Sequence, residues 1–411
     1  MFSLEKFYEV VYENLLAPLH VDYMGFTRFG SSDPSETFYK NHRENAWCPY
    51  SRVVVAYDQE PIHTQLASGL WNPQLLPDNE IYDVWRRELE GRYHHQGMRH
   101  WTPDFCVFAN SEHSEEKRRF VDQLGYHDWY YFFHGFAALD WYGNIPYRTP
   151  IDQYSRLFIT FNNLYTKKRS YRLTLVAELL ARGLAPSGHI SMNQQDIAGK
   201  ISSEIFDSRS EIHPADKKMI FQTMLPEPPR LVIDTDQPDG TLSADDNLET
   251  LCRGLWHIVT ETIYYDDKRH LTEKIFKPIV ARRPFILAAA PGNLAYLRSY
   301  GFQTFDQWID ERYDDEPDPG IRMRMIVDQV ERLCRLSDWD RDAMYRGMQP
   351  VLQHNYQWFY GGGFRGMITD ELVDNFRRCV IRHNAGRQSS DANWIDHSHM
   401  DWADIRRRLS Y

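Results

Sequence analysis

A polar segment between two apolar strands has the composition of a phosphate-binding element. Glu261 follows the first strand, and Thr272, Glu273 and Lys274 then open a helix. A helix N-terminus presents unpaired backbone N–H groups and the positive end of its dipole, which suits a diphosphate. Thr272 is the expected N-cap. Lys274 and Lys277 can neutralise phosphate charge, and the Glu273 carboxylate can accept two ribose hydroxyls. The alternative is an ordinary capped helix, in which Glu273 complements the dipole.

A second candidate group, Asp58-Gln59-Glu60-Pro61, directly follows another apolar strand. Parallel α/β sheets place ligand-contacting groups at this end of a strand. Transfer of a group to a hydroxyl with inversion needs a base, for which Glu60 is the first candidate and Asp58 the second. If the transferred group keeps its configuration, no such base is needed, and Glu60 instead orients the molecule whose hydroxyl receives the group. A plain turn fixed by Pro61 is the structural alternative. His134 is a third catalytic candidate, although a histidine beside aromatic residues is also typical of a hydrogen-bonded structural role.

Acidic pairs at Asp266-Asp267 and Asp314-Asp315 have the composition of a Mg²⁺ or Mn²⁺ site. Both pairs lie in hydrophilic, loop-like stretches, where acidic residues are usually solvated. His397 has too few ligating neighbours for a zinc site. We therefore predict no metal.

The apolar pattern predicts that strands and helices alternate along the chain. The expected strands lie at 52–57, 105–109, 130–133, 157–161, 188–191, 231–233, 256–259 and 284–287. The expected helices lie at 4–16, 114–124, 168–184 and 273–281, with a helix-rich stretch at 306–336. The polar segment 193–229 is expected to be a surface excursion. Such alternation is typical of parallel sheets built from βα units.

A chain of 411 residues indicates two to three domains. We place the first domain at 1–151 and the second at 152–383. A tail at 384–411 follows, whose helix we expect to cross back onto the first domain.

The formal net charge of −11 argues against a protein that coats nucleic acid through bulk charge. It leaves open a local basic groove at Lys167–Arg169, Arg282–Arg283 or Arg406–Arg408. The five cysteines are widely separated, as in a reduced cytosolic protein. No signal peptide and no membrane-spanning run are recognised, so we expect a cytoplasmic protein without a membrane partner.

The run from Glu261 through Thr272-Glu273-Lys274 to the strand opened by Pro284 resembles the donor-site signature of fucosyltransferase-like GT-B enzymes. A strand that ends in Asn162 and is followed by Arg169 and Arg172 is also similar to that family. The resemblance covers roughly residues 155–305 and, more loosely, residues 50–140. The Asp58–Pro61 element is similar to uncharacterised phage-encoded proteins. The donor-binding residues that the resemblance implies are Asn162, Arg169, Arg172, Glu261, Thr272, Glu273, Lys274 and Lys277.

The resemblance implies a GT-B-like α/β fold, in which two Rossmann-like domains face one another across a cleft. It implies a metal-independent glycosyltransferase that moves a sugar from a UDP- or GDP-linked donor to an acceptor hydroxyl, with no further cofactor. A hydroxymethylated base in phage DNA, modified in the host cytoplasm, is one acceptor; a glycan or protein hydroxyl is the other. The alternative is a non-catalytic GT-B-like binding, virion or assembly protein. A nucleotide-sugar epimerase or dehydrogenase is disfavoured, because no Gly-x-Gly-x-x-Gly follows an early strand.

Overall fold

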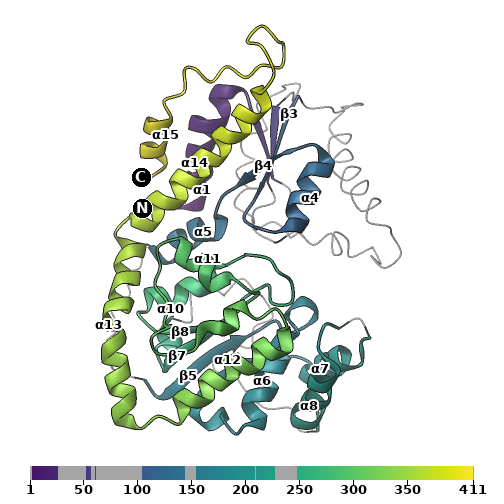
Figure 1. Cartoon of the computed structure of the whole chain (residues 1–411), viewed down its shortest axis with the longest axis vertical. Coiled ribbons are helices and arrows are strands. Elements are labelled where there is room, and N and C mark those ends of the chain that lie inside the picture. The colour runs from purple at the N-terminus through teal and green to yellow at the C-terminus, as the bar shows by residue number, and fades with distance from the viewer. Residues whose placement is uncertain are drawn as a thin grey trace. The chain divides into compact units, whose positions relative to one another are not determined.

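The computed structural model describes residues 2–25, 52–56, 61, 104–143, 154–208, 210–226 and 248–410 (Figure 1). The chain divides into two compact units. Unit 1 comprises Met1–Asp140 and Arg365–Tyr411, and unit 2 comprises Trp141–Phe364. In its described part, each unit contains a four-stranded parallel sheet and several helices, which confirms the predicted mixed α/β class.

The sheet of unit 1 has the order β1-β2-β3-β4, and every neighbouring pair is parallel. Its strands are β1 (Asp22–Gly25), β2 (Arg52–Ala56), β3 (Phe105–Asn110) and β4 (His127–Tyr130). All six residues of β3 are buried, as expected for a parallel strand that is covered on both faces. Between β3 and β4 runs α4 (Glu115–Leu124), and the Ser114 side chain accepts a hydrogen bond from the backbone N–H of Lys117. Ser114 is therefore the N-cap of α4.

The other α-helices in the described part of unit 1 are α1 (Leu4–Val11), α5 (Phe133–Gly143), α14 (Gly363–Asn384) and α15 (Trp402–Leu409). Helix α14 covers the outer strand of the sheet: Asn375 Nδ2 donates to the Tyr130 carbonyl at 2.9 Å, and Trp129 Nε1 donates to the Leu372 carbonyl at 3.0 Å. The chain returns to unit 1 at Arg365, so this unit includes more of the C-terminal region than the 384–411 tail.

The strand expected at 130–133 is partly wrong. Tyr130 ends β4, and Phe133 already belongs to α5. Residues Tyr130 to Phe133 are all buried. A short apolar run of this kind has no periodicity that separates a buried strand from the start of a buried helix.

The sheet of unit 2 has the order β6-β5-β7-β8 and is also entirely parallel. Its strands are β5 (Arg156–Asn162), β6 (Gly188–Met192), β7 (Gly254–Thr260) and β8 (Phe285–Ala288). The chain leaves β5 for β6 on one side and later crosses to β7 on the other side. The connections therefore diverge between β5 and β7, and α/β sheets bind ligands outside the carboxyl ends of the strands at such a point.

Eight α-helices belong to the described part of unit 2, and Figure 1 shows α6 and α12 lying over one face of its sheet. They are α6 (Tyr171–Ala181), α7 (Ile197–Phe206), α8 (Pro214–Met224), α9 (Leu248–Leu251), α10 (Phe276–Val280), α11 (Asn293–Ser299), α12 (Pro319–Cys334) and α13 (Asp338–Tyr360). The segment 193–229, expected to be a surface excursion, contains α7 and α8, for which no helix was predicted. Few apolar residues mark them: Ile201 and Ile205 are buried in α7, and Ile220 and Met224 in α8. The strand expected at 231–233 lies outside the described residues.

Gly254 opens β7 in close contact with β5. A Cβ atom at this position would lie 2.6 Å from Ile159 Cγ2 and 3.0 Å from the Ile159 backbone nitrogen. We expect Gly254→Ala to lower the free energy of unfolding of unit 2 by about 1–3 kcal/mol, because neither neighbour can move without disturbing the sheet. Urea unfolding measures the effect. Gly366→Ala is the control, since its Cβ would meet no atom within 4 Å. Equal midpoints for wild type and Gly254→Ala would show that the sheet absorbs the methyl group.

Candidate functional site

The candidate site of unit 2 lies where β5 and β7 end. Asn162 is the last residue of β5, and Glu261 directly follows β7. Both side chains are fully buried. The two residues that the sequence singled out at these strand ends are thus at the divergence point of the sheet, the position at which a parallel α/β sheet receives its ligand.

Asn162 has an unused hydrogen-bond acceptor. Its Nδ2 donates to the Ser191 carbonyl at 3.2 Å and to Thr160 Oγ1 at 3.4 Å. Its Oδ1 is buried and finds no donor in the described part of the chain. A buried acceptor without a donor costs roughly 1–3 kcal/mol, so few are left in native structures. A water molecule or a ligand that donates to Asn162 would remove this cost.

Glu261 anchors the loop that leads to Thr272. Its Oε1 accepts from the Thr272 backbone N–H at 3.2 Å, and its Oε2 accepts from Thr272 Oγ1 at 2.6 Å and from the Thr262 N–H at 3.2 Å. The Thr272 side chain also accepts from the Lys274 backbone N–H, which confirms the predicted N-cap. Because both carboxylate oxygens accept protein donors, Glu261 holds the backbone at Thr262 and Thr272 in place.

The helix expected at 273–281 is split into a 3₁₀ turn, Glu273–Ile275, and the short helix α10. Lys274 Nζ lies 3.0 Å from Glu273 Oε1 and 3.0 Å from Thr272 Oγ1. The Lys274 side chain is 28% exposed and that of Glu273 is 8% exposed. Lys277 is buried in α10. The pKa of His257 is lowered to about 3, mainly by the burial of His257 itself and secondly by the positive charge of Lys277. Lys274 is therefore the more accessible of the two predicted lysines.

Arg172 is placed differently from the predicted phosphate clamp. Its side chain is buried, and Nη1 donates to the Leu164 carbonyl at 2.7 Å. Nη2 donates to the Thr260 carbonyl at 2.8 Å and to the Glu261 carbonyl at 3.1 Å. Arg172 thus ties together the backbone just beyond β5 and β7. Arg169, three residues earlier in the 3₁₀ turn Lys167–Arg169, is half-buried.

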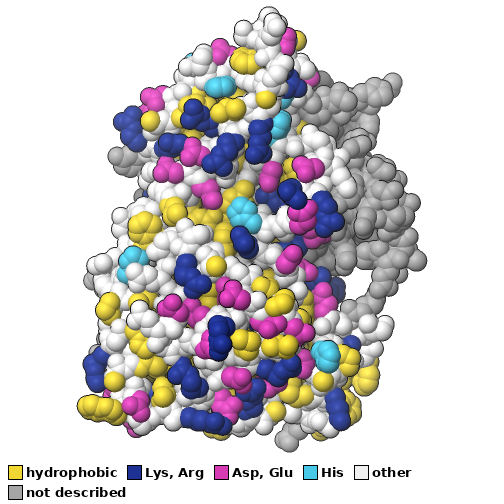
Figure 2. Space-filling view, in the orientation of Figure 1, with side chains coloured by type: hydrophobic (Ala, Val, Ile, Leu, Met, Phe, Trp, Pro, Cys, Tyr) yellow, Lys and Arg dark blue, Asp and Glu magenta, His cyan; other side chains and the backbone are white. Residues whose placement is uncertain are grey.

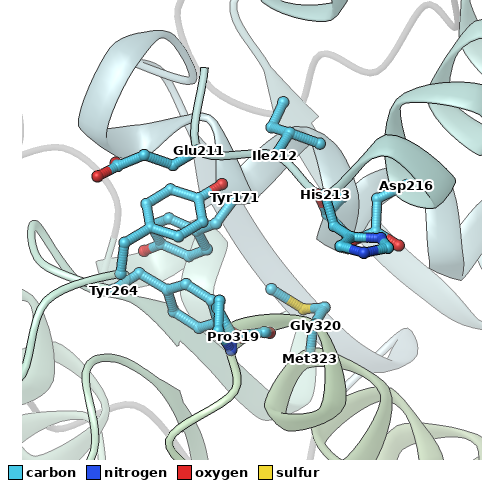
Figure 3. Close-up of a pocket in the computed structure, with 11 residues that line it drawn as sticks. Tyr171, Glu211, Ile212, His213, Asp216, Tyr264, Pro319, Gly320 and Met323 are labelled. Atoms are coloured by element: carbon cyan, nitrogen blue, oxygen red, sulfur yellow. The ribbon is translucent and has the colours of Figure 1, made fainter. Parts of the chain in front are cut away.

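Three tyrosines, Tyr171, Tyr264 and Tyr265, pack next to Glu261, and the sequence analysis did not identify them. Tyr171 donates through its hydroxyl to the Glu261 carbonyl at 2.5 Å, and its ring stacks on Tyr264 at 4.2 Å and 10° (Figure 3). Tyr265 stands edge-on to Tyr264, at 5.6 Å and 88°. A signal was available, because Tyr264-Tyr265 follows the β7 end by only a few residues and Tyr171 adjoins Arg172.

A cavity of about 20 Å³ lies beside these rings (Figure 3). Its lining residues include Tyr171, Tyr264, His213, Asp216 and Met323. Burial raises the pKa of the Asp216 carboxyl group above its ordinary value. The cavity is large enough for about one water molecule and too small for a nucleotide.

Helices α6 and α11, which follow β5 and β8, differ in their capping. Asp314 fills the N-terminus of α11, because its carboxylate accepts from the backbone N–H of Leu294 at 2.9 Å and of Ala295 at 3.1 Å. Helix α6 has no side-chain cap; its N-cap residue, Ser170, instead bonds Tyr265 at 3.1 Å. Of these two helices, α6 is therefore the one whose own N-terminus has no carboxylate cap. The basic turn before it is capped, because Glu204 Oε1 accepts from the Lys167 backbone N–H at 2.8 Å.

In each of the two acidic pairs considered as metal ligands, one aspartate makes a contact within the protein. Asp314 caps α11, and Asp266 Oδ1 lies 3.8 Å from Lys168 Nζ. Within the described residues, no three side chains of the metal-ligating types are grouped.

In unit 1, Asp58 and Glu60 lie outside the described residues. Another carboxylate, Glu112, is fully buried two residues beyond β3. Its side chain accepts from Ser114 Oγ, and its carbonyl accepts from Lys117 Nζ at 3.1 Å. Lys117 also pairs with Asp128 at 2.7 Å. These residues line an open hollow, which sequence reasoning missed although Asn110-Ser111-Glu112 directly follows an apolar run.

His134, the third catalytic candidate, lies in the first turn of α5 rather than after a strand. Its side chain is buried, and its ring packs edge-on against Phe133 at 5.2 Å.

The three basic clusters are partly engaged within the protein. Arg283 is buried and donates to the Cys252 carbonyl at 2.7 Å. Arg406 pairs with Asp374, and Lys168 pairs with Glu211 at 2.9 Å. On the face shown in Figure 2, Lys and Arg side chains are interspersed with Asp and Glu. That face is therefore of mixed charge.

No helix in the described ranges is both long and apolar enough to cross a bilayer. Comparison with known proteins finds no significant match to a protein-family model, a curated protein or a solved structure.

Proposed function

We propose that the chain is a glycosyltransferase of GT-B architecture, which binds a nucleotide diphosphate sugar in unit 2 and the acceptor hydroxyl in unit 1. One observation carries the proposal. At the divergence point of the unit 2 sheet, the unused Oδ1 of Asn162, the uncapped N-terminus of α6 and the anchored Glu261–Thr272 loop occur together. An acceptor for a ribose hydroxyl or a base N–H, a helix end that suits an anion, and a loop that carries the Glu273 carboxylate are groups that a nucleotide diphosphate can use.

In this proposal the diphosphate lies against the N-terminus of α6, beside Lys168 and Arg169. Lys274 supplies a further positive charge, and Glu273 accepts the ribose hydroxyls after releasing Lys274, with which it is paired at 3.0 Å. Arg172 does not contact the ligand in this proposal; it holds the backbone at Leu164, Thr260 and Glu261. As the glycosidic bond to the donor breaks, negative charge grows on the departing diphosphate, and the oriented N–H groups and cations stabilise it.

The acceptor side of the proposal rests on carboxylates that follow the strands of unit 1. Glu112 joins Glu60 and Asp58 as a candidate to take the proton of the attacking hydroxyl in an inverting reaction. The internal bonds of Arg283 and Arg406 favour a glycan or protein hydroxyl over a base in duplex DNA. A gel shift with DNA at low salt would reverse this preference.

A thermal-shift screen with UDP-, GDP-, dTDP- and CMP-sugars tests the donor site. We expect one UDP- or GDP-linked class, at about one hundred times its Kd, to raise the Tm of unit 2 by roughly 5 °C. Glu273→Ala should abolish this shift, because the ribose loses its acceptor. Asp342→Ala, which removes an exposed carboxylate from α13, is the control and should keep the shift.

The outcomes separate the hypotheses. A normal shift for Glu273→Ala removes Glu273 from the donor site. If no nucleotide sugar stabilises the wild type, the non-catalytic binding or assembly protein becomes the better hypothesis.

A further inference from the structure

We infer that four side chains stacked in the order Arg172, Tyr171, Tyr264 and Arg322 form a positioning column for the ligand site of unit 2. The ligand in question rests on the proposed function; the column itself rests on contacts within unit 2. The inference assigns Arg172 and Tyr171 as residues that act through the backbone of Glu261, and it extends the site to α12.

The four groups form a continuous stack. The Arg172 guanidinium lies 5.8 Å from the centroid of the Tyr171 ring, the two tyrosine rings are 4.2 Å apart, and the Arg322 guanidinium lies 4.3 Å from the Tyr264 centroid. All four side chains are buried. A cation over an aromatic face contributes up to about 2 kcal/mol when it is shielded from water, so these contacts stabilise the stack.

The two ends of the column hold different backbone segments. Arg172 and Tyr171 donate to carbonyls beyond β5 and at the end of β7, namely those of Leu164, Thr260 and Glu261. Arg322 and Tyr264 donate to the carbonyls around the start of α12, namely those of Glu316, Pro317 and Pro319, and Arg322 also donates to that of Tyr264. The column therefore fixes the strand ends against α12.

Glu261 passes this constraint on to the candidate ligand residues. Its carbonyl is held by Tyr171 and Arg172, while its carboxylate holds Thr272. Thr272 in turn bonds Lys274 Nζ at 3.0 Å. Burial raises the pKa of Tyr171, so its hydroxyl remains a donor at neutral pH. A displacement at Tyr171 is thus passed by three hydrogen-bonded steps to Lys274.

Two matched variants test the column. Tyr171→Phe and Tyr264→Phe each keep the stacked rings and each remove one hydroxyl that donates to a backbone carbonyl, at 2.5 Å and 2.8 Å respectively. Only the Tyr171 hydroxyl reaches Glu261. The readouts are hydrogen–deuterium exchange of the full chain and the Kd for whichever nucleotide sugar stabilises the wild type.

We expect Tyr171→Phe to raise amide exchange in the 261–275 segment and to weaken the Kd by roughly tenfold, the effect of losing one hydrogen bond. Tyr264→Phe should raise exchange around 316–323 and leave the Kd within about twofold of wild type. Wild-type exchange at 261–275 in Tyr171→Phe, or equal effects of both variants on the Kd, would overturn the inference.

The test separates this inference from the proposed function. If the wild type binds no nucleotide sugar, the proposed function fails, and the exchange data alone decide whether the column positions the loop. A selective rise at 261–275 in Tyr171→Phe then supports the column, and its absence rejects it.

Discussion

Replacement of Arg172 by methionine is expected to lower the free energy of unfolding of unit 2 by roughly 3–5 kcal/mol. The substitution removes the hydrogen bonds from a charged guanidinium to the carbonyls of Leu164, Thr260 and Glu261. The bonds to Thr260 and Glu261 are buried, so water cannot readily replace the donor of either bond. Methionine has a similar length, so the loss reports the bonds more than the volume. Urea unfolding followed by a probe in unit 2 measures the effect.

Arg169→Met is the matched control, because Arg169 is half-buried and lies only three residues away. We expect it to change stability by less than about 1 kcal/mol and to weaken nucleotide-sugar binding. A stability loss in Arg172→Met together with a binding loss in Arg169→Met would distinguish an arginine that holds the backbone from one that contacts the ligand. A loss below about 1 kcal/mol for Arg172→Met would show that the carbonyls find other donors.

Acid is expected to destabilise unit 2 through His257. This residue is buried in the middle of β7, and burial together with the charge of Lys277 lowers its pKa from 6.5 to about 3. Between these two pH values the unfolded chain binds a proton that the folded chain does not. The stability is therefore complete above pH 6.5, falls as the pH decreases, and is lost by up to about 5 kcal/mol near the folded-state pKa.

The variant His257→Phe cannot titrate and keeps the edge-on ring contact with Phe161, which lies at 5.6 Å in the wild type. We expect its unfolding free energy to depend less on pH between 6.5 and 3 than that of the wild type. His189→Phe, on β6 at the other side of β5, is the control; His189 is less buried, so the wild-type slope should largely remain. Parallel pH profiles for wild type and His257→Phe would exclude His257 as the source.

The strands of both sheets were largely predictable, because their signal is local. The runs around Val53–Val55 and Phe158–Phe161 are apolar and β-branched or aromatic, and they form β2 and β5. Helices α7 and α8 were missed, since each buries only a few apolar residues among polar ones. The first residue of α5, Phe133, was assigned to a strand, because the run Phe132-Phe133 fits either structure.

The site was predictable in its location and less so in its roles. Thr272 is an N-cap, as its residue type and position predict, and Asn162 and Glu261 lie at strand ends. The role of Arg172 depends on the strand order β6-β5-β7-β8, which brings the end of β7 beside the start of α6. Spacing within one segment carries no information about that neighbour. The stack of Tyr171 on Tyr264 also depends on this strand order, so the sequence alone does not predict it.

Unit 1 is composed of two stretches of chain that are separated by the whole of unit 2. During synthesis on the ribosome, β4 emerges long before helix α14, which supplies the bonds from Asn375 to Tyr130 and from Cys379 to Asp128. Unit 2 is continuous and has no such delay. At roughly 5–20 residues per second, the first sheet waits on the order of ten to forty seconds for its covering helix. A nascent chain therefore completes its second unit first, and premature termination before Arg365 releases a first unit with an uncovered sheet edge.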